Sequence, residues 1–158
     1  MERKLIIASD LGRFRALLVE YFPKVSPRVE NLVDQEFVDA HRKVLDHVSD
    51  QAGRHGGPTG HPGAAPMADD HNLRLETQRR LIKEIAKSTV EQLQAYPDLP
   101  CWFAAPREIY KQILEEIPTS LRGRIEKIEA RNVAKLHPHD LVKLFDPEAF
   151  KRFHANRQ

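Results

Sequence analysis

The chain has 158 residues, of which 41% are apolar and 30% charged, and its net charge is +2 with neutral histidines. This composition is typical of one soluble globular domain and excludes a disordered or fibrous chain. The sequence contains no apolar run near the roughly 20 residues that cross a bilayer, and its first residues do not resemble a secretory signal. The only cysteine, Cys101, excludes an intrachain disulfide and a multi-cysteine zinc site. We therefore expect one cytoplasmic domain over residues 1–158, and the mild charge leaves its partner open.

The first 37 residues predict three strands. Residues 4–9 and 13–21 are rich in apolar side chains and flank the turn residues Asp10-Leu11-Gly12. This pattern is typical of a β-hairpin in which Gly12 can adopt a positive φ. Residues 29–37 predict the third strand. By the two-residue period, one of its faces would be mixed and would carry Val29, Asn31, Val33, Gln35 and Phe37.

A segment rich in glycine and proline follows a short helix predicted over residues 39–48. Five of the seven glycines of the chain lie between Gly53 and Gly63, with two prolines among them and Pro66 close behind. Neither a helix nor a strand tolerates that density of breakers. We expect a loop over about residues 50–71, and its length indicates either a function or disorder.

The next elements predict a helix followed by a β-α-β unit. Apolar residues recur at helical spacing within 73–94, which predicts a long amphipathic helix lying across a sheet. The continuous apolar run 101–105, bounded by prolines, predicts a buried strand in which Cys101 is a structural thiol. Residues 107–117 predict a helix that residues 121–124 extend or follow, and residues 125–133 predict a returning parallel strand.

Two terminal helices complete the prediction. Pro138 and the pair Asp146-Pro147 are typical helix starts, with Asp146 as the N-cap of the second helix. Together the elements predict an α/β fold, a mixed β-sheet with flanking helices.

Several segments resemble a known bacterial family. They are Ile6-Ile7-Ala8-Ser9-Asp10-Leu11-Gly12-Arg13-Phe14-Arg15-Ala16-Leu17-Leu18, the long helix, Phe103-Ala104-Ala105-Pro106-Arg107, Leu121-Arg122 and residues 126–135. They look like the family named for a protein required for attachment to host cells, which is itself similar to the middle domain of archaeal and eukaryotic peptide chain release factors. The resemblance implies a ribonuclease-H-like mixed sheet flanked by helices.

The resemblance gives the glycine-rich loop a possible meaning. In release factors a Gly-Gly-Gln loop before a long helix helps water to cleave the peptidyl-tRNA ester. Here His55, Gly56, Gly57 and Pro58 stand before the long helix, and proline replaces the glutamine. Proline lacks the backbone N–H that could stabilise an oxyanion. The loop is therefore either a degenerate functional loop or a simple flexible linker.

The sequence contains candidate ligands for two kinds of metal site. Imidazole and carboxylate ligands for a metal gather in or beside the loop at His55, His61, Asp69, Asp70 and His71, but their spacing matches no known metal signature. A two-metal nuclease would use Asp10, Asp34 and Glu36, yet Asp10 is explained as a turn residue and strand 101–105 carries no acid. We predict no metal, no cofactor and no catalytic residue.

The densest basic stretch follows the predicted helix 107–117. Its cations could contact phosphate, since guanidinium groups bind phosphate in a bidentate manner. A solvated face that alternates with Glu126 and Glu129 is the alternative. The candidate phosphate-binding residues are Arg122, Arg124, Lys127 and Arg131, with Lys135 close behind.

These observations lead to two functional hypotheses and a third class. The first is a non-enzymatic binding or adaptor protein of the host-attachment family, with an indirect role in attachment and an unknown protein partner. The second is a translation-associated protein that binds the ribosome or tRNA, with a degenerate peptidyl-tRNA hydrolase as its enzymatic form. A metal-dependent hydrolase is the third class.

Overall fold

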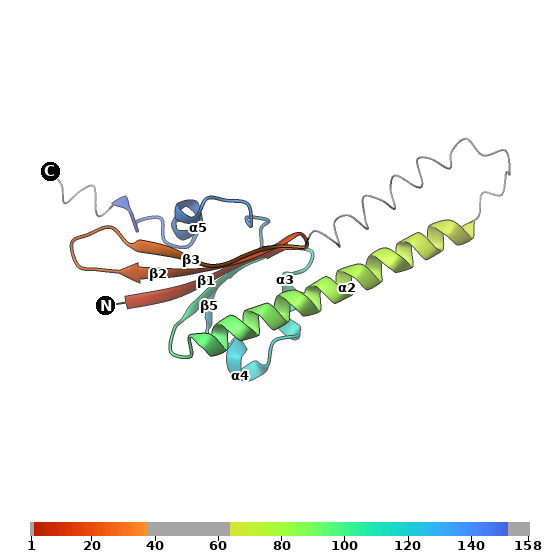
Figure 1. Ribbon diagram of the computed structural model, residues 1–158, viewed down its shortest axis with the longest axis horizontal. Coiled ribbons are helices and arrows are strands. Elements are labelled where there is room, and N and C mark those ends of the chain that lie inside the picture. Colours follow the sequence, from red (N-terminus) through yellow and green to blue (C-terminus); the bar gives the residue numbers. More distant parts are fainter. Residues whose placement is uncertain (1, 38–63, 152–158) are drawn as a thin grey trace.

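The computed structural model describes residues 2–37 and 64–151, and the side chains of all of these except residues 64–70. Within these residues, five strands form one mixed sheet in the order β3-β2-β1-β4-β5, and helices cover both of its faces (Figure 1). This confirms the α/β class and the mixed sheet with flanking helices. The elements are β1 (Glu2–Asp10), β2 (Arg13–Tyr21), β3 (Arg28–Glu36), α2 (Ala64–Ala95), β4 (Cys101–Ala104), α3 (Tyr110–Glu115), α4 (Thr119–Arg122), β5 (Ile125–Glu129) and α5 (Pro138–Phe145).

The predicted hairpin is confirmed, but its turn is made differently. β1 and β2 pair antiparallel, from Glu2 opposite Tyr21 to Asp10 opposite Arg13. The expectation of a positive φ at Gly12 is wrong, because none of the described glycines has one. Instead the Gly12 N–H donates to Asp10 Oδ1 at 2.7 Å. A side chain that accepts from the backbone two residues on is a turn of its own, so the hairpin does not need the left-handed region.

The third strand contains a β-bulge that the two-residue period does not predict. Ala16 pairs with Val33 and the next residue, Leu17, pairs with Asn31, so Leu32 has no direct partner on β2. The extra residue reverses the facing of the strand. Val33 therefore packs on the α2 side of the sheet and Val29 on the α5 side. The prediction that these two residues share a face is wrong for this reason.

The long helix begins earlier than expected. α2 starts at Ala64, so residues 64–71, which the sequence assigns to the loop, are helical. Pro66 lies in the first turn, where the backbone N–H groups have no partner within the helix, and proline is tolerated there. The rest of the predicted loop and the predicted helix over 39–48 lie outside the described residues. Among the described helices, including this one of 32 residues, none has the length and apolarity to span a bilayer.

The β-α-β unit is confirmed with shorter elements than predicted. β4 pairs parallel with both β1 and β5, and all four of its residues are buried. Residues 107–109 form a turn before α3 rather than its first helical residues, and the N–H groups of Ile109 and Tyr110 both donate to the Pro106 carbonyl. β5 ends at Glu129, earlier than the predicted residue 133, and residues 130–137 lie outside the sheet.

The two faces of the sheet have separate cores. Alternate residues of β4 point to opposite sides, so Cys101 and Phe103 pack against α2 and α3, whereas Trp102 and Ala104 pack against α5. Trp102 is 3% exposed, and its ring stacks on Phe145 at 5.6 Å between centroids. This confirms the sequence-based placement of the long helix across a sheet with a buried thiol and a buried tryptophan.

At the C-terminal end, one of the two predicted helix starts is confirmed. Pro138 begins α5, with the His137 side chain as its N-cap. Asp146, predicted as the N-cap of a further helix, is the C-cap of α5 and is followed by a turn over residues 147–150. The N–H of Asp146 donates to the Val142 carbonyl and so continues the end of α5.

Candidate functional site

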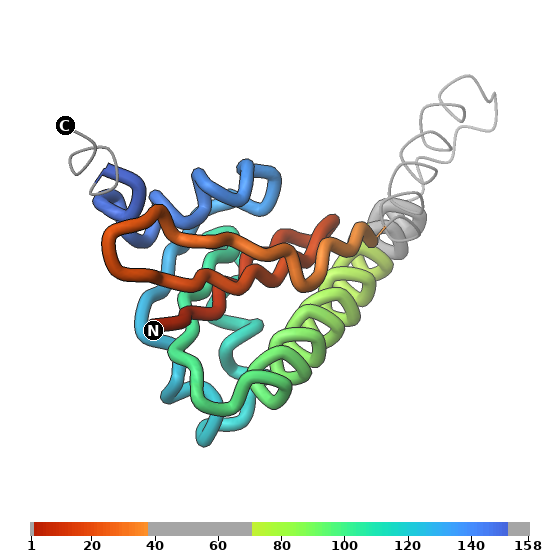
Figure 2. The backbone as a smooth tube through the Cα atoms, turned by 60° about the vertical axis from the view of Figure 1, so that its left-hand side comes forward, coloured from red at the N-terminus to blue at the C-terminus, as the bar shows by residue number. Residues whose placement is uncertain are grey.

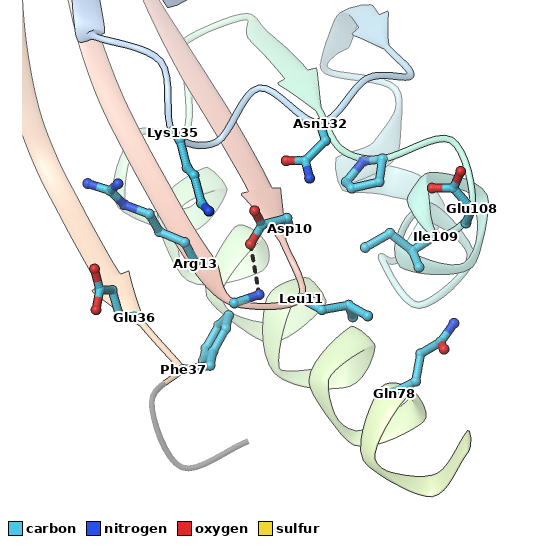
Figure 3. Close-up of a pocket in the computed structure, with 12 residues that line it drawn as sticks. Asp10, Leu11, Arg13, Glu36, Phe37, Gln78, Glu108, Ile109, Asn132 and Lys135 are labelled. Carbon is cyan, nitrogen blue, oxygen red and sulfur yellow. Dashed lines mark hydrogen bonds between the residues drawn. The ribbon is translucent and has the colours of Figure 1, made fainter. Parts of the chain in front are cut away.

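A pocket with converging polar groups lies at one edge of the sheet. β1, β4 and β5 run parallel, and the pocket lies where the chain leaves them: Asp10 ends β1, Pro106 follows β4 and Asn132 follows β5 (Figure 3). β1 and β3 are both antiparallel to β2, so β3 ends at the same edge of the sheet and adds Glu36 to the pocket. The carboxyl ends of parallel strands are where open α/β sheets bind ligands. The cavity volume, about 630 Å³, suits a small molecule or one side chain of a partner.

Asp10 forms the floor of this pocket and is held in place by the hairpin. The residue is only 9% exposed, and its Oδ1 accepts the Gly12 N–H at 2.7 Å. Its second oxygen, Oδ2, accepts no hydrogen bond from the described residues. One carboxylate oxygen is therefore structural and the other remains available inside the cavity.

Arg13 lines the pocket, but its charge is already paired with that of a carboxylate on β3. Its Nε and Nη2 donate to Oδ1 and Oδ2 of Asp34 at 2.7 and 2.6 Å, a bidentate ion pair between neighbouring strands. This hydrogen-bonded pair lowers the pKa of Asp34 and raises the pKa of Arg13. In Figure 3 the Arg13 guanidinium points away from Asp10. Arg13 is consequently a wall of the pocket rather than a free cation in it.

Arg15, two residues further along β2, fixes the part of the pocket wall that carries Lys135. It is 3% exposed, and its Nη1 donates to the Ala134 carbonyl at 3.0 Å and also to the Leu136 carbonyl. These carbonyls flank Lys135, so the buried guanidinium holds the backbone on both sides of that lysine. Burial lowers the pKa of Arg15. Lys135 then extends toward the β1–β2 turn, with Asn132 beside it (Figure 3).

The remaining walls mix apolar and polar side chains. Leu11, Phe37 and Ile109 supply apolar surface, and Phe37 is fixed by its N–H, which donates to the Gly12 carbonyl at 2.8 Å. Gln78 from α2 and Glu108 from the turn before α3 lie on the far side. Apolar walls with a few converging polar groups are the usual composition of a binding site.

Ser9, next to the pocket residue Asp10, and Cys101, at the opposite end of β4 from the pocket, are not arranged for covalent catalysis. Ser9 is 1% exposed, and its hydroxyl donates to the backbone carbonyls of Asp10 and Arg13. Burial raises the pKa of the Cys101 thiol to about 12. None of the described residues that line the pocket is a histidine. Neither Ser9 nor Cys101 is therefore poised to attack a bound substrate.

The buried thiol leads to a prediction about stability and reactivity. Because the pKa of Cys101 is about 12 in the folded chain and about 8.5 when unfolded, only the unfolded state loses the proton as the pH rises from about 9 to 12. The stability contributed by the protonated thiol should therefore fall across that window. We expect negligible reaction of Cys101 with Ellman's reagent at pH 8 in folded protein and full reaction in denaturant. Rapid reaction without denaturant would contradict the buried position.

The acidic residues of the nuclease hypothesis do not gather in one place. Asp10 and Glu36 line the pocket, whereas Asp34 pairs with Arg13 outside it. Among the described side chains, those of residues 2–37 and 71–151, no set of three histidine, cysteine or acidic groups is placed to hold a metal ion. His71 is exposed on α2, and the other proposed loop ligands lie outside the described side chains. So do His55, Gly56, Gly57 and Pro58.

The four predicted phosphate-binding cations lie at different places, and three of them contact backbone carbonyls. Arg124 donates to the carbonyls of Leu93, Tyr96 and Leu99 at the end of α2. Arg122 donates to the Ile117 carbonyl at 2.9 Å.

The other two cations lie on and after β5. Lys127 donates to the Phe145 carbonyl at 2.8 Å on the α5 side of the sheet, with its Nζ 4.6 Å from the centroid of the Trp102 ring. Arg131 is largely exposed, 3.8 Å from Glu129. Phosphate binding by these residues stays a prediction. In the structure, three of them stabilise the ends of helices or turns by donating to backbone carbonyls.

Sequence reasoning named Asp10, Glu36 and Lys135 but did not bring them together, and it missed Glu108 and Asn132. The signal that was overlooked is the position of these polar residues relative to the ends of the strands. Polar residues that directly follow parallel strands meet at one edge of the sheet, and a search for them would have found this pocket.

Comparison with known proteins supports one family. A search of curated proteins found no match to the chain. The profile of a family described as a protein required for attachment to host cells matches residues 5–144. The match runs from β1 into α5 and so includes nearly all of the described fold and all residues of the pocket. The chain belongs to the family of proteins required for attachment to host cells.

Proposed function

We propose that this chain is a non-enzymatic binding or adaptor protein that holds its partner or ligand in the pocket at the carboxyl edge of the sheet. The observation that carries the proposal is the pocket itself, with apolar walls, the buried Asp10 carboxylate and the positioned Lys135 among its lining residues. The buried thiol and the engaged Ser9 hydroxyl support binding rather than covalent chemistry.

We also propose the location of the protein, its domain organisation and its kinship to other folds. We place the protein in the cytoplasm, with an indirect role in attachment, and treat residues 1–158 as one domain. The mixed sheet with helices on both faces supports the proposed kinship with ribonuclease-H-like folds and with the middle domain of release factors. In that kinship His55, Gly56, Gly57 and Pro58 would be a degenerate functional loop.

Nuclear magnetic resonance on the full chain tests the binding function. A panel of small cationic, anionic and neutral molecules is titrated into ¹⁵N-labelled protein. We expect at least one of them to shift a contiguous set of amide resonances around Asp10, Gly12 and Lys135. No shift at these residues with any class, or turnover of an ester or phosphodiester that Asp10→Asn abolishes, would overturn the proposal.

A second candidate function, binding to ribosomal or transfer RNA, is favoured by the surface of α2. α2 lies against one face of the sheet, and no described element covers its opposite side (Figures 1 and 2). Four exposed cations lie along a shallow groove on this helix: Arg79, Arg80, Lys83 and Lys87. None of the four forms an ion pair with a described carboxylate, although Glu76 and Glu84 lie beside them. Unpaired cations at helical spacing suit a phosphate backbone.

Co-sedimentation with ribosomes tests this second candidate. We expect association of the wild-type chain at low salt, loss at high salt, and about a tenfold weaker association for the pair Arg79→Gln and Lys83→Gln at low salt. The matched control is Arg107→Gln with Lys111→Gln, two exposed cations elsewhere on the chain. Absence of the chain from the ribosomal pellet at either salt, or equal loss in the control, would exclude a role for the α2 groove.

A further inference from the structure

The charges around the carboxyl-edge pocket are unbalanced. Three carboxylates line it: Asp10, Glu36 and Glu108. Of the two cations among the described lining residues, Arg13 is neutralised by its bidentate pair with Asp34, which leaves Lys135. None of the three carboxylates pairs with a cation among the described residues. The described residues therefore give the pocket an excess of negative charge.

Of these three carboxylates, Asp10 is buried, whereas Glu36 and Glu108 are exposed. Burying a carboxylate removes favourable interactions with water that must be replaced. The Gly12 N–H replaces them at Oδ1, while Oδ2 has no partner among the described residues and faces the cavity. A carboxylate that is nine-tenths buried with one free oxygen in a cavity can accept a hydrogen bond from a donor on a ligand.

The groups around Asp10 indicate what kind of donor would fit. An ammonium group has three N–H donors and a guanidinium has five, and neither has an acceptor. The side-chain oxygens of Asn132, Gln78 and Glu108 line the same cavity and can accept further N–H groups. Leu11, Phe37 and Ile109 provide apolar surface for the carbon chain that would carry the cation. Lysine and arginine side chains combine these two properties, with an apolar stem and a charged head.

We propose that the carboxyl-edge pocket binds a positively charged amine or guanidinium carried on an aliphatic stem. The source is either a basic side chain of a protein partner or a free diamine. Lys135 opposes this ligand and sets its position, because a second cation must bind away from the Lys135 ammonium. This inference rests on the proposed binding function and specifies its ligand.

Titration of ¹⁵N-labelled full chain tests the inference. The probes are N-acetyl-lysine-N-methylamide for a side chain and 1,4-diaminobutane for a free amine. N-acetyl-norleucine-N-methylamide has nearly the same stem without the charge. We expect saturable shifts of the Asp10, Gly12 and Asn132 amides with one or both amines and none with the norleucine probe. The tighter of the two amines identifies the source. Equal shifts with magnesium chloride alone would overturn the need for an aliphatic stem.

Substitutions separate a cation site from an anion site. We expect Glu36→Gln and Glu108→Gln each to weaken amine binding about three- to tenfold, the effect of one charge at several ångströms in a partly solvated site. Glu30→Gln is the matched control, because Glu30 is exposed on the same strand as Glu36 but outside the pocket. Lys135→Met is expected to tighten amine binding by a similar factor.

The opposite results are equally informative. If acetate or phosphate shifts the pocket resonances instead, and Lys135→Met weakens that binding, the pocket takes an anion and the present inference is wrong while the binding function stands. If neither charged nor neutral probes shift these resonances, the binding function itself fails.

Discussion

Replacement of Arg124 by alanine is expected to destabilise the fold by about 3 kcal/mol, because several charge-assisted hydrogen bonds are lost together. The guanidinium donates to the Leu93 carbonyl at 2.5 Å and to the Leu99 carbonyl at 2.8 Å, and also to that of Tyr96. Leu93 belongs to the last turn of α2, where carbonyls have no partner within the helix and a cation is favoured by the helix dipole. Without Arg124 these carbonyls would lose their partner where α2 meets β4.

Urea denaturation followed by circular dichroism measures this effect, which corresponds to a decrease in Tm of about 6 to 12 °C for a chain of this size. Arg131→Ala is the matched control. It removes an arginine only seven residues away whose side chain is 64% exposed and 3.8 Å from Glu129, and such exposed pairs contribute about 0 to 1 kcal/mol. Equal stability of Arg124→Ala and wild type would show that the capping contacts contribute nothing and would leave Arg124 free for phosphate.

Substitution of Arg15 by methionine is expected to cost about 2 kcal/mol and to loosen the wall of the pocket that carries Lys135. Two effects compete. Removal of the guanidinium takes away hydrogen bonds to the Ala134 and Leu136 carbonyls, each worth about 1.5 to 3 kcal/mol when the donor is charged. Against this, the fold no longer has to bury a cation whose Nε has no partner in the structure. Loss of the hydrogen bonds outweighs the relief, because methionine cannot donate to either carbonyl.

Hydrogen exchange distinguishes this local effect from a general loss of stability. We expect faster amide exchange at residues 133–136 in Arg15→Met than the global change in stability explains. Arg28→Met, an exposed arginine at the start of β3, makes the same chemical change without burial and should leave both stability and exchange close to wild type. Unchanged exchange at residues 133–136 in Arg15→Met would mean that another contact positions Lys135.

Many features of the fold follow from local patterns in the sequence. The apolar run from Cys101 to Ala104 predicts a buried strand, and the structure buries every residue of it. The 3.6-residue period of α2 predicts the face that packs on the sheet, and Leu81, Ile82 and Ile85 are buried there. These predictions hold because burial of apolar surface dominates the free energy of folding, and alternation or helical spacing records which side of an element is buried.

Other features depend on contacts between distant residues. The bulge at Leu32 arises from pairing with β2 and changes which side chains of β3 share a face. The sequence pattern did not predict the start of α2 at Ala64, because Pro66 was taken as a helix breaker. Proline is tolerated in the first turn of a helix. Arg124 and Lys127 were predicted by charge alone to face phosphate, whereas the structure shows them bonded to carbonyls about 30 and 18 residues away in the chain.

The sequence by itself determined the class of fold, the succession of its five strands along the chain, the burial of Cys101 and Trp102, and the membership of the host-attachment family. Only the tertiary structure decided that Asp10, Glu108 and Lys135 share one pocket, because they follow three different parallel strands and meet only when β1, β4 and β5 lie side by side. It also decided the role of Arg15. A buried arginine is stable only where carbonyl acceptors reach it, and these acceptors are about 120 residues away in the chain.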